Sequence, residues 1–162
     1  MCYYLIVKVL PTEIKKFLSL HYLATIATIS IHNDYPYIIP IFYITSDVSR
    51  LYFATHKNSK TFQNILSNPH ISISITDPTN LISLQLQGIA TVTEQKTEII
   101  QQILVLANEK SENSMPPLMQ IEAGTMQLVA VTPHWYKLSN YSNNTATFVE
   151  GSLDNPNEVN KA

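Results

Sequence analysis

The sequence contains little cysteine, glycine or charge. It has one cysteine, Cys2, three glycines and one arginine, Arg50, and charged residues make up only 14% of its 162 positions. A single cysteine excludes an internal disulfide and a zinc site built on several thiolates. The basic residues are scattered and the formal net charge is -2, so no cationic face is available to neutralise several nucleic-acid phosphates. No nucleic-acid partner is therefore expected.

The histidines do not form a metal-binding pattern. No two of them stand three or four residues apart, which is the spacing that brings two imidazoles to one metal ion on a helix. We therefore predict no metal site and interpret the histidines as surface or turn residues: His21, His32, His56, His70 and His134.

The amino-terminal run MCYYLIVKVL is apolar but short. Lys8 interrupts it, no basic residue precedes it, and a membrane-spanning helix needs about 20 apolar residues. We expect residues 1–10 to form an arm or an additional strand, and we expect no membrane partner. Because the run also lacks the features of an export signal, the expected compartment is the cytoplasm.

Most of the apolar patterns are typical of β-strands. HISISIT, residues 70–76, alternates strictly between polar and apolar positions. LATIATISI, residues 23–31, has apolar residues at both odd and even positions, which predicts a strand covered on both faces. Gly88 indicates a bulge or a close backbone approach. Further strands are predicted over 36–45, 50–55, 81–93 and 125–141, with a hairpin turn at 46–49, and helices from Thr12 to about His21, from Lys60 onward and over about 94–108.

The number of strands and the short connections between them favour a mainly β fold. Six or seven antiparallel strands with three helices predict a β-barrel with peripheral helices. A chain of this length buries one core, so residues 1–141 are predicted to form a single domain. Residues 142–162 are rich in Asn and Ser and contain few large apolar side chains, which predicts a flexible C-terminal tail.

The segment THKNSKTFQNILSNP places polar and basic residues where a strand gives way to a helix. If Ser59 caps a helix that begins at Lys60, the free N–H groups of that helix start lie near the hydroxyls of Ser59 and Thr61 and the ammonium of Lys60. This arrangement predicts a phosphate-sized anion site. The alternative is an ordinary capped surface helix with a lysine that serves solubility.

A proline interrupts the strand predicted at 36–45. Pro40 cannot donate a hydrogen bond to a neighbouring strand, so one edge of this strand is expected to be unpaired. Backbone groups at Ile39 and Ile41 would then be available to the rim of a planar heterocycle. The alternative is an edge strand whose proline only guards against aggregation.

The order of these segments resembles the pyridoxamine 5'-phosphate oxidase-like family of FMN-binding split barrels. That family's pattern runs from a helix and an LAT strand through a P-x-x-x-P strand and a strand ending in Thr. It continues with a serine and basic residues that open a helix containing Asn-Leu, and then Asn-Pro before the next strand. The corresponding segments of this chain, between residues 11 and 93, are FLSLHYLATIAT, PYIIPIFYI, LYFAT, SKTFQNILSNP and GIATVTE.

The resemblance implies a homodimer that holds FMN at the subunit interface. It also implies which residues would contact the cofactor. The flavin ring would meet backbone groups of Ile39, Pro40 and Ile41, and the ribityl chain would lie beside Ala54 and Thr55. The phosphate would be held by Ser59, Lys60 and Thr61, and Trp135 would pack near the cofactor of the partner subunit. An equally good interpretation of Trp135 is a core tryptophan whose N–H is satisfied within its own chain.

The chain departs from the family pattern at three positions. Family members commonly have two basic residues after the serine, where this chain has Lys60 and Thr61. The oxidases themselves place an arginine at the position of Ile39 and a glutamine at that of Ser83. They also hold a phosphorylated vitamin with C-terminal arginine and histidine residues, which are missing after Trp135.

Three functions remain open at this stage. The first is an FMN-dependent oxidoreductase, distinct from pyridoxamine-phosphate oxidase, that transfers a hydride between a nicotinamide or a small substrate and the flavin. No side chain is assigned as a catalytic acid, base or nucleophile. The second is a non-catalytic split-barrel module that has lost tight FMN binding and holds heme or another small ligand. The third is a purely structural interaction dimer that binds no ligand.

Overall fold

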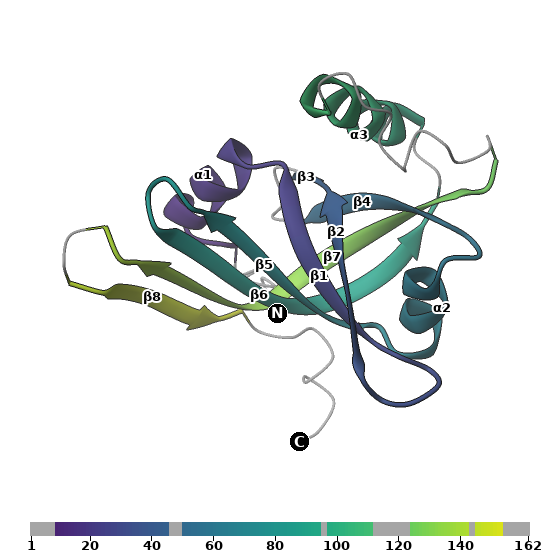
Figure 1. Cartoon of the computed structure of the whole chain (residues 1–162), viewed down its shortest axis with the longest axis horizontal. Coiled ribbons are helices and arrows are strands. Elements are labelled where there is room, and N and C mark those ends of the chain that lie inside the picture. The colour runs from purple at the N-terminus through teal and green to yellow at the C-terminus, as the bar shows by residue number, and fades with distance from the viewer. Residues whose placement is uncertain (1–8, 46–49, 95–96, 112–123, 143–144, 154–162) are drawn as a thin grey trace, which may run out of the picture.

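The computed structural model describes residues 9–45, 50–94, 97–111, 124–142 and 145–153. Most of the predicted N-terminal arm and the 46–49 turn lie outside these residues. Figure 1 shows a strongly curled sheet with helices at its periphery. In chain order the elements are α1 (Thr12–Leu20), β1 (Leu23–Ile29), β2 (Pro36–Phe42), β3 (Ile44–Thr45), β4 (Leu51–His56), α2 (Lys60–Ser67), β5 (His70–Asp77), β6 (Ile82–Thr93), α3 (Thr97–Lys110), β7 (Met126–Asn140) and β8 (Thr147–Ser152).

All eight strands belong to one antiparallel sheet. Its order is β2-β1-β5-β6-β7-β4-β3, and β8 also pairs with β7. The long strand β7 has β6 on one edge and shares its other edge between β4 and β8. This sheet confirms the predicted mainly β architecture, a curled half-barrel with peripheral helices. None of the described helices is long and apolar enough to cross a membrane.

Alternating side chains of the strands fill the inside of the half-barrel. Ile71, Ile73 and Ile75 of β5 are buried there, as the alternation predicts. The i, i+3, i+4 spacing of Ile14, Phe17 and Leu18 predicts an apolar face on the first helix, and α1 covers one end of this core with these three side chains. Thr12 is expected to cap this helix, but Pro11 is the N-cap residue and Thr12 is already helical, so the helix begins one residue earlier than a Thr12 cap would place it.

Strand β4 is covered on both of its faces. Leu51 and Phe53 point into the main core. Tyr52 and Ala54 point the other way, into a second apolar cluster where Ile103 of α3 packs on the sheet. The two-sided burial explains why LYFAT contains almost no polar residue.

Strand β1, in contrast, is covered on one face only within this chain. Ala24 and Ile26 are buried, whereas Leu23 is 49% exposed and Thr25 is exposed. The prediction that β1 is covered on both faces is therefore wrong for the single chain. The strand thus carries apolar side chains on its outer face, and no described element of the same chain covers that face.

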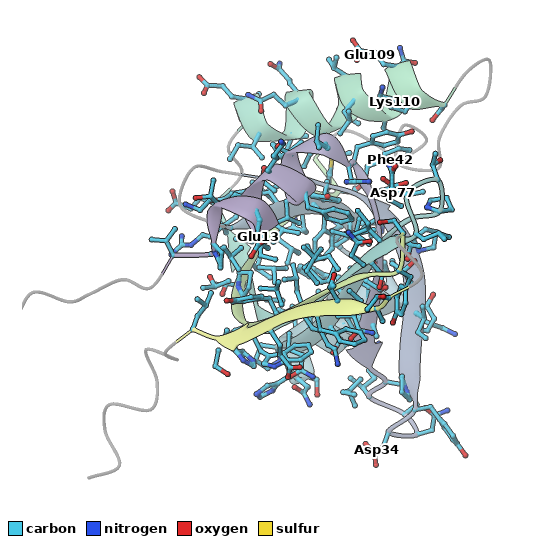
Figure 2. All side chains as sticks on the ribbon, turned by 90° about the vertical axis from the view of Figure 1, so that its left-hand side faces the viewer. Glu13, Asp34, Phe42, Asp77, Glu109 and Lys110 are labelled. Carbon is cyan, nitrogen blue, oxygen red and sulfur yellow. The ribbon has the colours of Figure 1, made fainter. Side chains whose placement is uncertain are left out.

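Helix α3 closes the sheet over β4 and the end of β2. The helical pattern over about 94–108 predicts burial of Ile99, Ile103 and Leu106. The structure buries Ile103 and Ala107 and leaves Ile99 and Leu106 half-buried, so the inward face is turned slightly from the predicted one. The ammonium of Lys110 lies 5.0 Å from the centre of the Tyr22 ring, and that ring stacks on Phe42. Figure 2 shows Lys110 and Phe42 close together beneath the helix end. The cation–π contact thus joins α3 to the strands β1 and β2.

Part of the predicted C-terminal tail is a strand. Residues 147–152 form β8, which pairs with the second half of β7. The segment is short of buried side chains, and Phe148 is 53% exposed. Composition could not reveal this strand because its order comes from backbone pairing with β7 rather than from burial of its own side chains.

Gly88 occupies a bulge, as its position in the strand pattern predicts. The register between β6 and β7 shifts between Gln87 and Gly88. A Cβ atom at Gly88 would lie 2.6 Å from the backbone oxygen of Thr132 and 3.0 Å from a side-chain carbon of Val131. Glycine is required here because the two backbones approach too closely for any side chain.

Gly88→Ala is expected to lower the free energy of unfolding by about 2 kcal/mol, because the backbone of β7 must move to admit the methyl group. Urea unfolding measures the change. Gly124→Ala is the comparison, since its backbone is left-handed with φ of 87° but a Cβ there meets nothing within 4 Å. Equal losses in the two variants would show that close approach is not the reason for Gly88.

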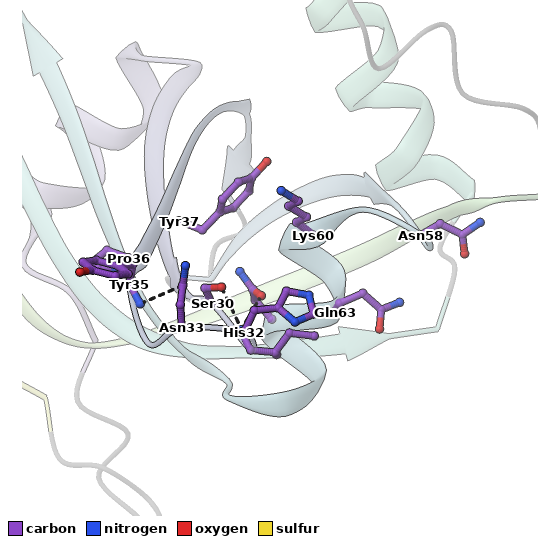
Figure 3. Close-up of a pocket in the computed structure, with 11 residues that line it drawn as sticks. Ser30, His32, Asn33, Tyr35, Pro36, Tyr37, Asn58, Lys60 and Gln63 are labelled. Atoms are coloured by element: carbon purple, nitrogen blue, oxygen red, sulfur yellow. Dashed lines mark hydrogen bonds between the residues drawn. The ribbon is translucent and has the colours of Figure 1, made fainter.

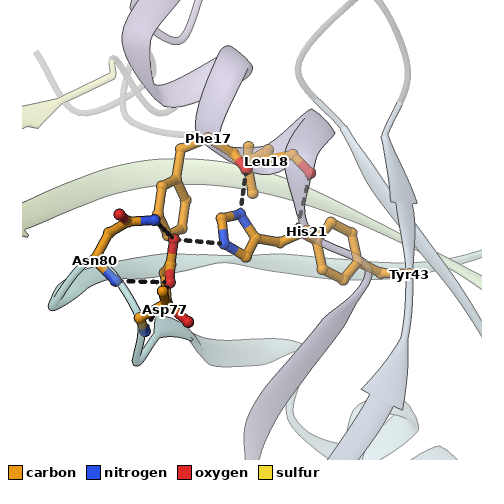
Figure 4. Close-up of polar contacts among 7 residues, drawn as sticks. Phe17, Leu18, His21, Tyr43, Asp77 and Asn80 are labelled. Atoms are coloured by element: carbon orange, nitrogen blue, oxygen red, sulfur yellow. Dashed lines mark hydrogen bonds and ion pairs between the residues drawn. The ribbon is translucent and has the colours of Figure 1, made fainter. Parts of the chain in front are cut away.

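A polar cluster ties the end of α1 to the turn between β5 and β6 (Figure 4). His21 stacks on Phe17 and its Nδ1 lies 2.7 Å from the Phe17 carbonyl oxygen, while its Nε2 lies 3.6 Å from Asp77 Oδ2. The Asn80 side chain donates to the same carboxylate at 2.7 Å, and the N–H groups of Thr79 and Asn80 donate to its Oδ1. The carboxylate therefore organises the turn.

The hydrogen bonds from Asn80 are the main reason that the pKa of Asp77 lies below its ordinary value of 3.8. The carboxylate consequently stabilises the fold above that value, and this contribution is lost as the pH falls through the lowered pKa. We expect Asp77→Asn to destabilise the protein at pH 7 and to cost progressively less as the pH approaches 3, as measured by urea unfolding. Asp34→Asn, at the tip of the β1–β2 hairpin (Figure 2), removes the same charge outside this cluster and serves as the comparison. A constant Asp77→Asn penalty would contradict this role.

Candidate functional site

Strand β2 has an open edge. Among the described strands it pairs with β1 alone. Two hydrogen bonds continue this pairing beyond the strand ends, from Tyr43 N to Tyr22 O and from Ser30 N to Tyr35 O, and both are 3.0 Å long. They fix the phase of the pairing, that is, which residues of β2 bond to β1. Bonded and non-bonded residues alternate in an antiparallel pair, so the odd-numbered residues of β2 bond to β1 and the even-numbered ones face away from it.

Both prolines of β2 lie at even-numbered positions. Pro36 and Pro40 therefore remove no bond from the β1–β2 pairing. This phase confirms the prediction that one edge of the strand is unpaired. The open edge is the side of β2 that faces away from β1.

The identity of the free backbone groups differs from the prediction. Ile39 and Ile41 direct their N–H and C=O groups to β1, and their side chains pack toward the main core. The groups on the open edge belong instead to Ile38, Phe42 and the carbonyl of Pro40. The sequence shows that the proline leaves one edge of the strand unpaired. It does not show which neighbouring residues point their backbone groups to that edge, because this depends on the hydrogen bonds to β1.

Helix α2 begins with the predicted cap. Ser59 is the N-cap residue, and its Oγ accepts a hydrogen bond from Phe62 N at 3.1 Å. Thr55, at the end of β4, bonds to the same Oγ at 2.8 Å and fixes the cap to the sheet. The N–H groups of Lys60 and Thr61 lie in the first turn, where an α-helix offers no acceptor. They leave positive partial charge at this helix start.

Lys60 faces β2 across the start of α2. Its Nζ lies 5.8 Å from the centre of the Tyr37 ring (Figure 3). Lys60 is exposed, and no carboxylate of the described residues forms an ion pair with it. A cation in the first turn is unfavourable beside the helix dipole. An anion at this position would remove that conflict.

A pocket of about 490 Å³ lies between α2 and the β1–β2 turn. We call it the turn pocket; one wall is formed by the turn residues Ser30–Asn33 and Tyr35–Tyr37 and the other by Asn58, Lys60, Gln63 and Asn64 (Figure 3). Its lining contains amides, hydroxyls and aromatic rings, one lysine and no carboxylate. This chemistry suits an anionic or hydrogen-bonding ligand.

Asn64 holds the two walls of the turn pocket together. It is only 3% exposed. Its Oδ1 accepts a hydrogen bond from Ile31 N at 3.2 Å, and its Nδ2 donates to Thr28 Oγ1 at 3.0 Å. Since Asn64 lies one helical turn after Lys60, these bonds set the position of Lys60 relative to the β1–β2 hairpin.

Thr61 and Ala54 are two of the four predicted contact residues that are buried; the other two are Ile41 and Thr55. Thr61 is 1% exposed, so its hydroxyl lies under α2 and only its N–H group is at the helix start. The Ala54 side chain is 7% exposed and packs in the cluster beneath α3. Their part in cofactor binding stays a prediction, limited to backbone groups.

Trp135 lies apart from α2, on the outer face of the sheet. Its Nε1 donates to Glu150 Oε1 at 3.2 Å. It lines a pocket of about 330 Å³ that crosses the sheet from Trp135 on β7 to Ile38 on β2. One chain therefore brings Thr55, Ser59 and Lys60 together but does not bring Trp135 to them.

Sequence reasoning missed Tyr37 and Asn64 as residues of this site. Asn64 carried a weak signal, because a residue four positions after Lys60 lies on the same side of a helix. Tyr37 carried none, since its nearness to Lys60 depends on how the hairpin meets α2. In the described part of the chain, no three His, Cys, Asp or Glu side chains gather as a metal site would require.

The chemical groups of the described residues suit the phosphate and the ring of FMN. The start of α2 supplies N–H groups and one unpaired ammonium for a phosphate, and the open edge of β2 supplies backbone donors and acceptors for a heterocycle. No carboxylate lines the turn pocket to repel an anion. The fit is limited in charge, because Lys60 is the only lysine or arginine in this lining.

Solved structures with the same fold share little sequence with this chain. A protein from Listeria innocua described as a putative pyridoxamine 5'-phosphate oxidase is 16% identical, with a TM-score of 0.57 over 76% of this chain and 93% of that one. An FMN-binding, pyridoxamine 5'-phosphate oxidase-related protein from Nostoc punctiforme is 11% identical, with a TM-score of 0.57 over 86% and 91%. A heme-binding protein from Mycobacterium smegmatis is 13% identical, with a TM-score of 0.63 over 90% and 60%.

At these identities the solved structures establish the fold, a split barrel, and nothing finer. No curated protein matches the sequence. The model of the pyridoxamine 5'-phosphate oxidase family, however, matches residues 10–139, which include β1, β2, α2 and most of β7. With its half-barrel, its open β2 edge and its capped α2, the chain belongs to the pyridoxamine 5'-phosphate oxidase family.

Proposed function

We propose that this protein binds FMN as a homodimer and acts as an FMN-dependent oxidoreductase on a small substrate or a nicotinamide. The observation that carries the proposal is the unpaired Lys60 ammonium at the start of α2, next to the open edge of β2. Membership of the family supports FMN as the ligand. A neighbour of the same fold is described as FMN-binding.

The phosphate of FMN would bind at the start of α2. The N–H groups of Lys60 and Thr61 lie in the first turn of this helix, the Lys60 side chain adds an ammonium, and the bond between Thr55 and Ser59 holds the helix start in place. A charge-assisted hydrogen bond contributes about 1.5–3 kcal/mol. Lys60 is therefore the largest single contributor that this chain offers to phosphate binding.

The flavin ring would meet the open edge of β2. The N–H and C=O groups of Ile38 and Phe42 and the Pro40 carbonyl face that edge, as the phase of the β1–β2 pairing requires. A heterocycle with alternating donors and acceptors on its rim can bond to such groups as a further strand would. When bound, the flavin supplies hydride exchange, which no side chain of the protein provides.

The exposed face of β1 and β2 supports the homodimer. On this face Leu23 lies opposite Phe42, and Ala27 lies opposite Ile38, which is 61% exposed. The pocket lined by Trp135 begins on the same face. A second copy packed there would cover these apolar side chains and would bring a partner's Trp135 toward the flavin.

A second function remains a candidate because the site has a single lysine. Thr61 is buried and replaces the second cation of the family pattern, so FMN binding with one ammonium is expected to be weak. A non-catalytic module of the same fold would hold heme or another small ligand instead. A neighbour of the same fold is described as a heme-binding protein, which supports this second candidate.

Purification and flavin titration separate the two candidates. The oxidoreductase is expected to bind FMN with quenching of flavin fluorescence, and the bound flavin should bleach when a nicotinamide reductant is added. Size-exclusion chromatography with light scattering tests the homodimer. A folded protein that ignores FMN but binds heme would overturn the oxidoreductase and support the second candidate.

A further inference from the structure

The turn pocket is larger than a phosphate site. Lys60 lies at the start of α2, but Gln63 and Asn64 continue the same wall one helical turn further on. The pocket thus runs along the side of the helix toward the β1–β2 turn rather than ending at the N-terminus of α2 (Figure 3). A volume of about 490 Å³ lies within the range of small-molecule pockets.

The far part of the turn pocket offers aromatic and amide groups. Tyr37 presents a ring beside Lys60 (Figure 3), and His32 from the turn and Gln63 from α2 also line the pocket. Within the described part of the chain, no hydrogen bond engages the Tyr37 hydroxyl, the His32 ring or the Asn58 side chain. The Gln63 amide donates to Lys57 O at 3.3 Å, which leaves its carbonyl oxygen free.

These groups are the kind that recognise a purine base. Amide side chains pair with the donor and acceptor on the adenine edge, and bases stack on tyrosine rings. A second phosphate would lie between the base and the flavin phosphate, within reach of Lys60. Base contacts would also compensate for the missing second cation, because they add affinity that does not depend on charge.

We propose that the turn pocket binds the adenylate half of a dinucleotide, with its base at Tyr37 and Gln63 and its phosphate at Lys60. The proposal rests on the FMN site described above. Two molecules share this chemistry: flavin adenine dinucleotide bound in place of FMN, and a nicotinamide adenine dinucleotide whose adenylate half binds beside FMN.

Fluorescence and calorimetric titrations of the full chain test the proposal. We expect either that FAD binds at least tenfold more tightly than FMN, or that AMP binds to the FMN-loaded protein; the first result identifies the flavin dinucleotide and the second the nicotinamide dinucleotide. Loss of one base–tyrosine stack corresponds to about tenfold in affinity. Tyr37→Leu should therefore reduce the FAD-to-FMN affinity ratio, or the AMP affinity, about tenfold.

Tyr141→Leu is the matched control, because Tyr141 is another exposed tyrosine but packs against Phe148, outside the turn pocket. Thermal unfolding of both variants confirms that they are folded, and Gln63→Ala replaces Tyr37→Leu if that variant does not fold. If FMN binds, FAD binds no more tightly and AMP does not bind, the adenylate site is wrong while the FMN site stands. If no flavin and no AMP binds, both proposals are overturned.

Discussion

Lys60→Ala is expected to weaken FMN binding by about 10- to 150-fold, the largest effect of any single substitution at the proposed site. The estimate follows from the 1.5–3 kcal/mol of a charge-assisted hydrogen bond and from the absence of a second lysine or arginine in the lining of the turn pocket. Removing the ammonium should also reduce the dependence of FMN affinity on salt concentration. Fluorescence titration at two ionic strengths measures both effects.

Lys16→Ala is the control for this substitution. It removes the same charge from an exposed lysine on α1 that does not line the turn pocket. The two variants have the same net charge, so any general electrostatic attraction of FMN to the protein cancels in the comparison. If both variants bind FMN with the same affinity, the phosphate does not bind at Lys60.

Asn64→Ala is expected to lower the free energy of unfolding by about 2–3 kcal/mol. The substitution leaves the buried Thr28 hydroxyl and the N–H of Ile31 without the partner that Asn64 provides, and it opens a small cavity under α2. For a domain of this size the loss corresponds to a fall in melting temperature of about 4–10 °C. Chemical and thermal unfolding measure it directly.

Asn64→Ala should also weaken ligand binding, because it frees α2 to shift against the β1–β2 hairpin and so separates Lys60 from Tyr37. Ser67→Ala, an exposed position near the end of the same helix, is expected to change stability by less than about 0.5 kcal/mol. A melting temperature for Asn64→Ala that matches that of Ser67→Ala would contradict the role of Asn64 as the link between the two walls.

Local features of the site were predictable because they depend on neighbouring residues. The Ser59 cap follows from a serine placed before a helical pattern, and its hydrogen bond to Phe62 N confirms it. The break in β2 pairing follows from Pro40, since a proline has no N–H to donate. Gly88 marked its bulge for an equally local reason, the lack of space for a side chain.

Other features depend on contacts between distant segments and carried no usable signal. One face of β4 lies against the main core, and its other face is covered only because α3 packs on it. The outer face of β1 is also apolar but stays open in the single chain. β8 exists because β7 is long enough to pair with a strand beyond β4. The phase of β2, which turns Ile39 and Ile41 toward β1, is set by the hydrogen bonds at both ends of the hairpin.

The sequence alone determined the antiparallel β class, the core side chains of α1 and β5, the cap of α2 and the proline-bearing edge, because periodicity, capping and the missing proline N–H act over a few residues. The tertiary structure decided which backbone groups of β2 are free, that Thr61 is buried, and that Tyr37 faces Lys60 across the turn pocket. These depend on strand phase and on the packing of α2 against a hairpin more than 20 residues away, which no local pattern encodes.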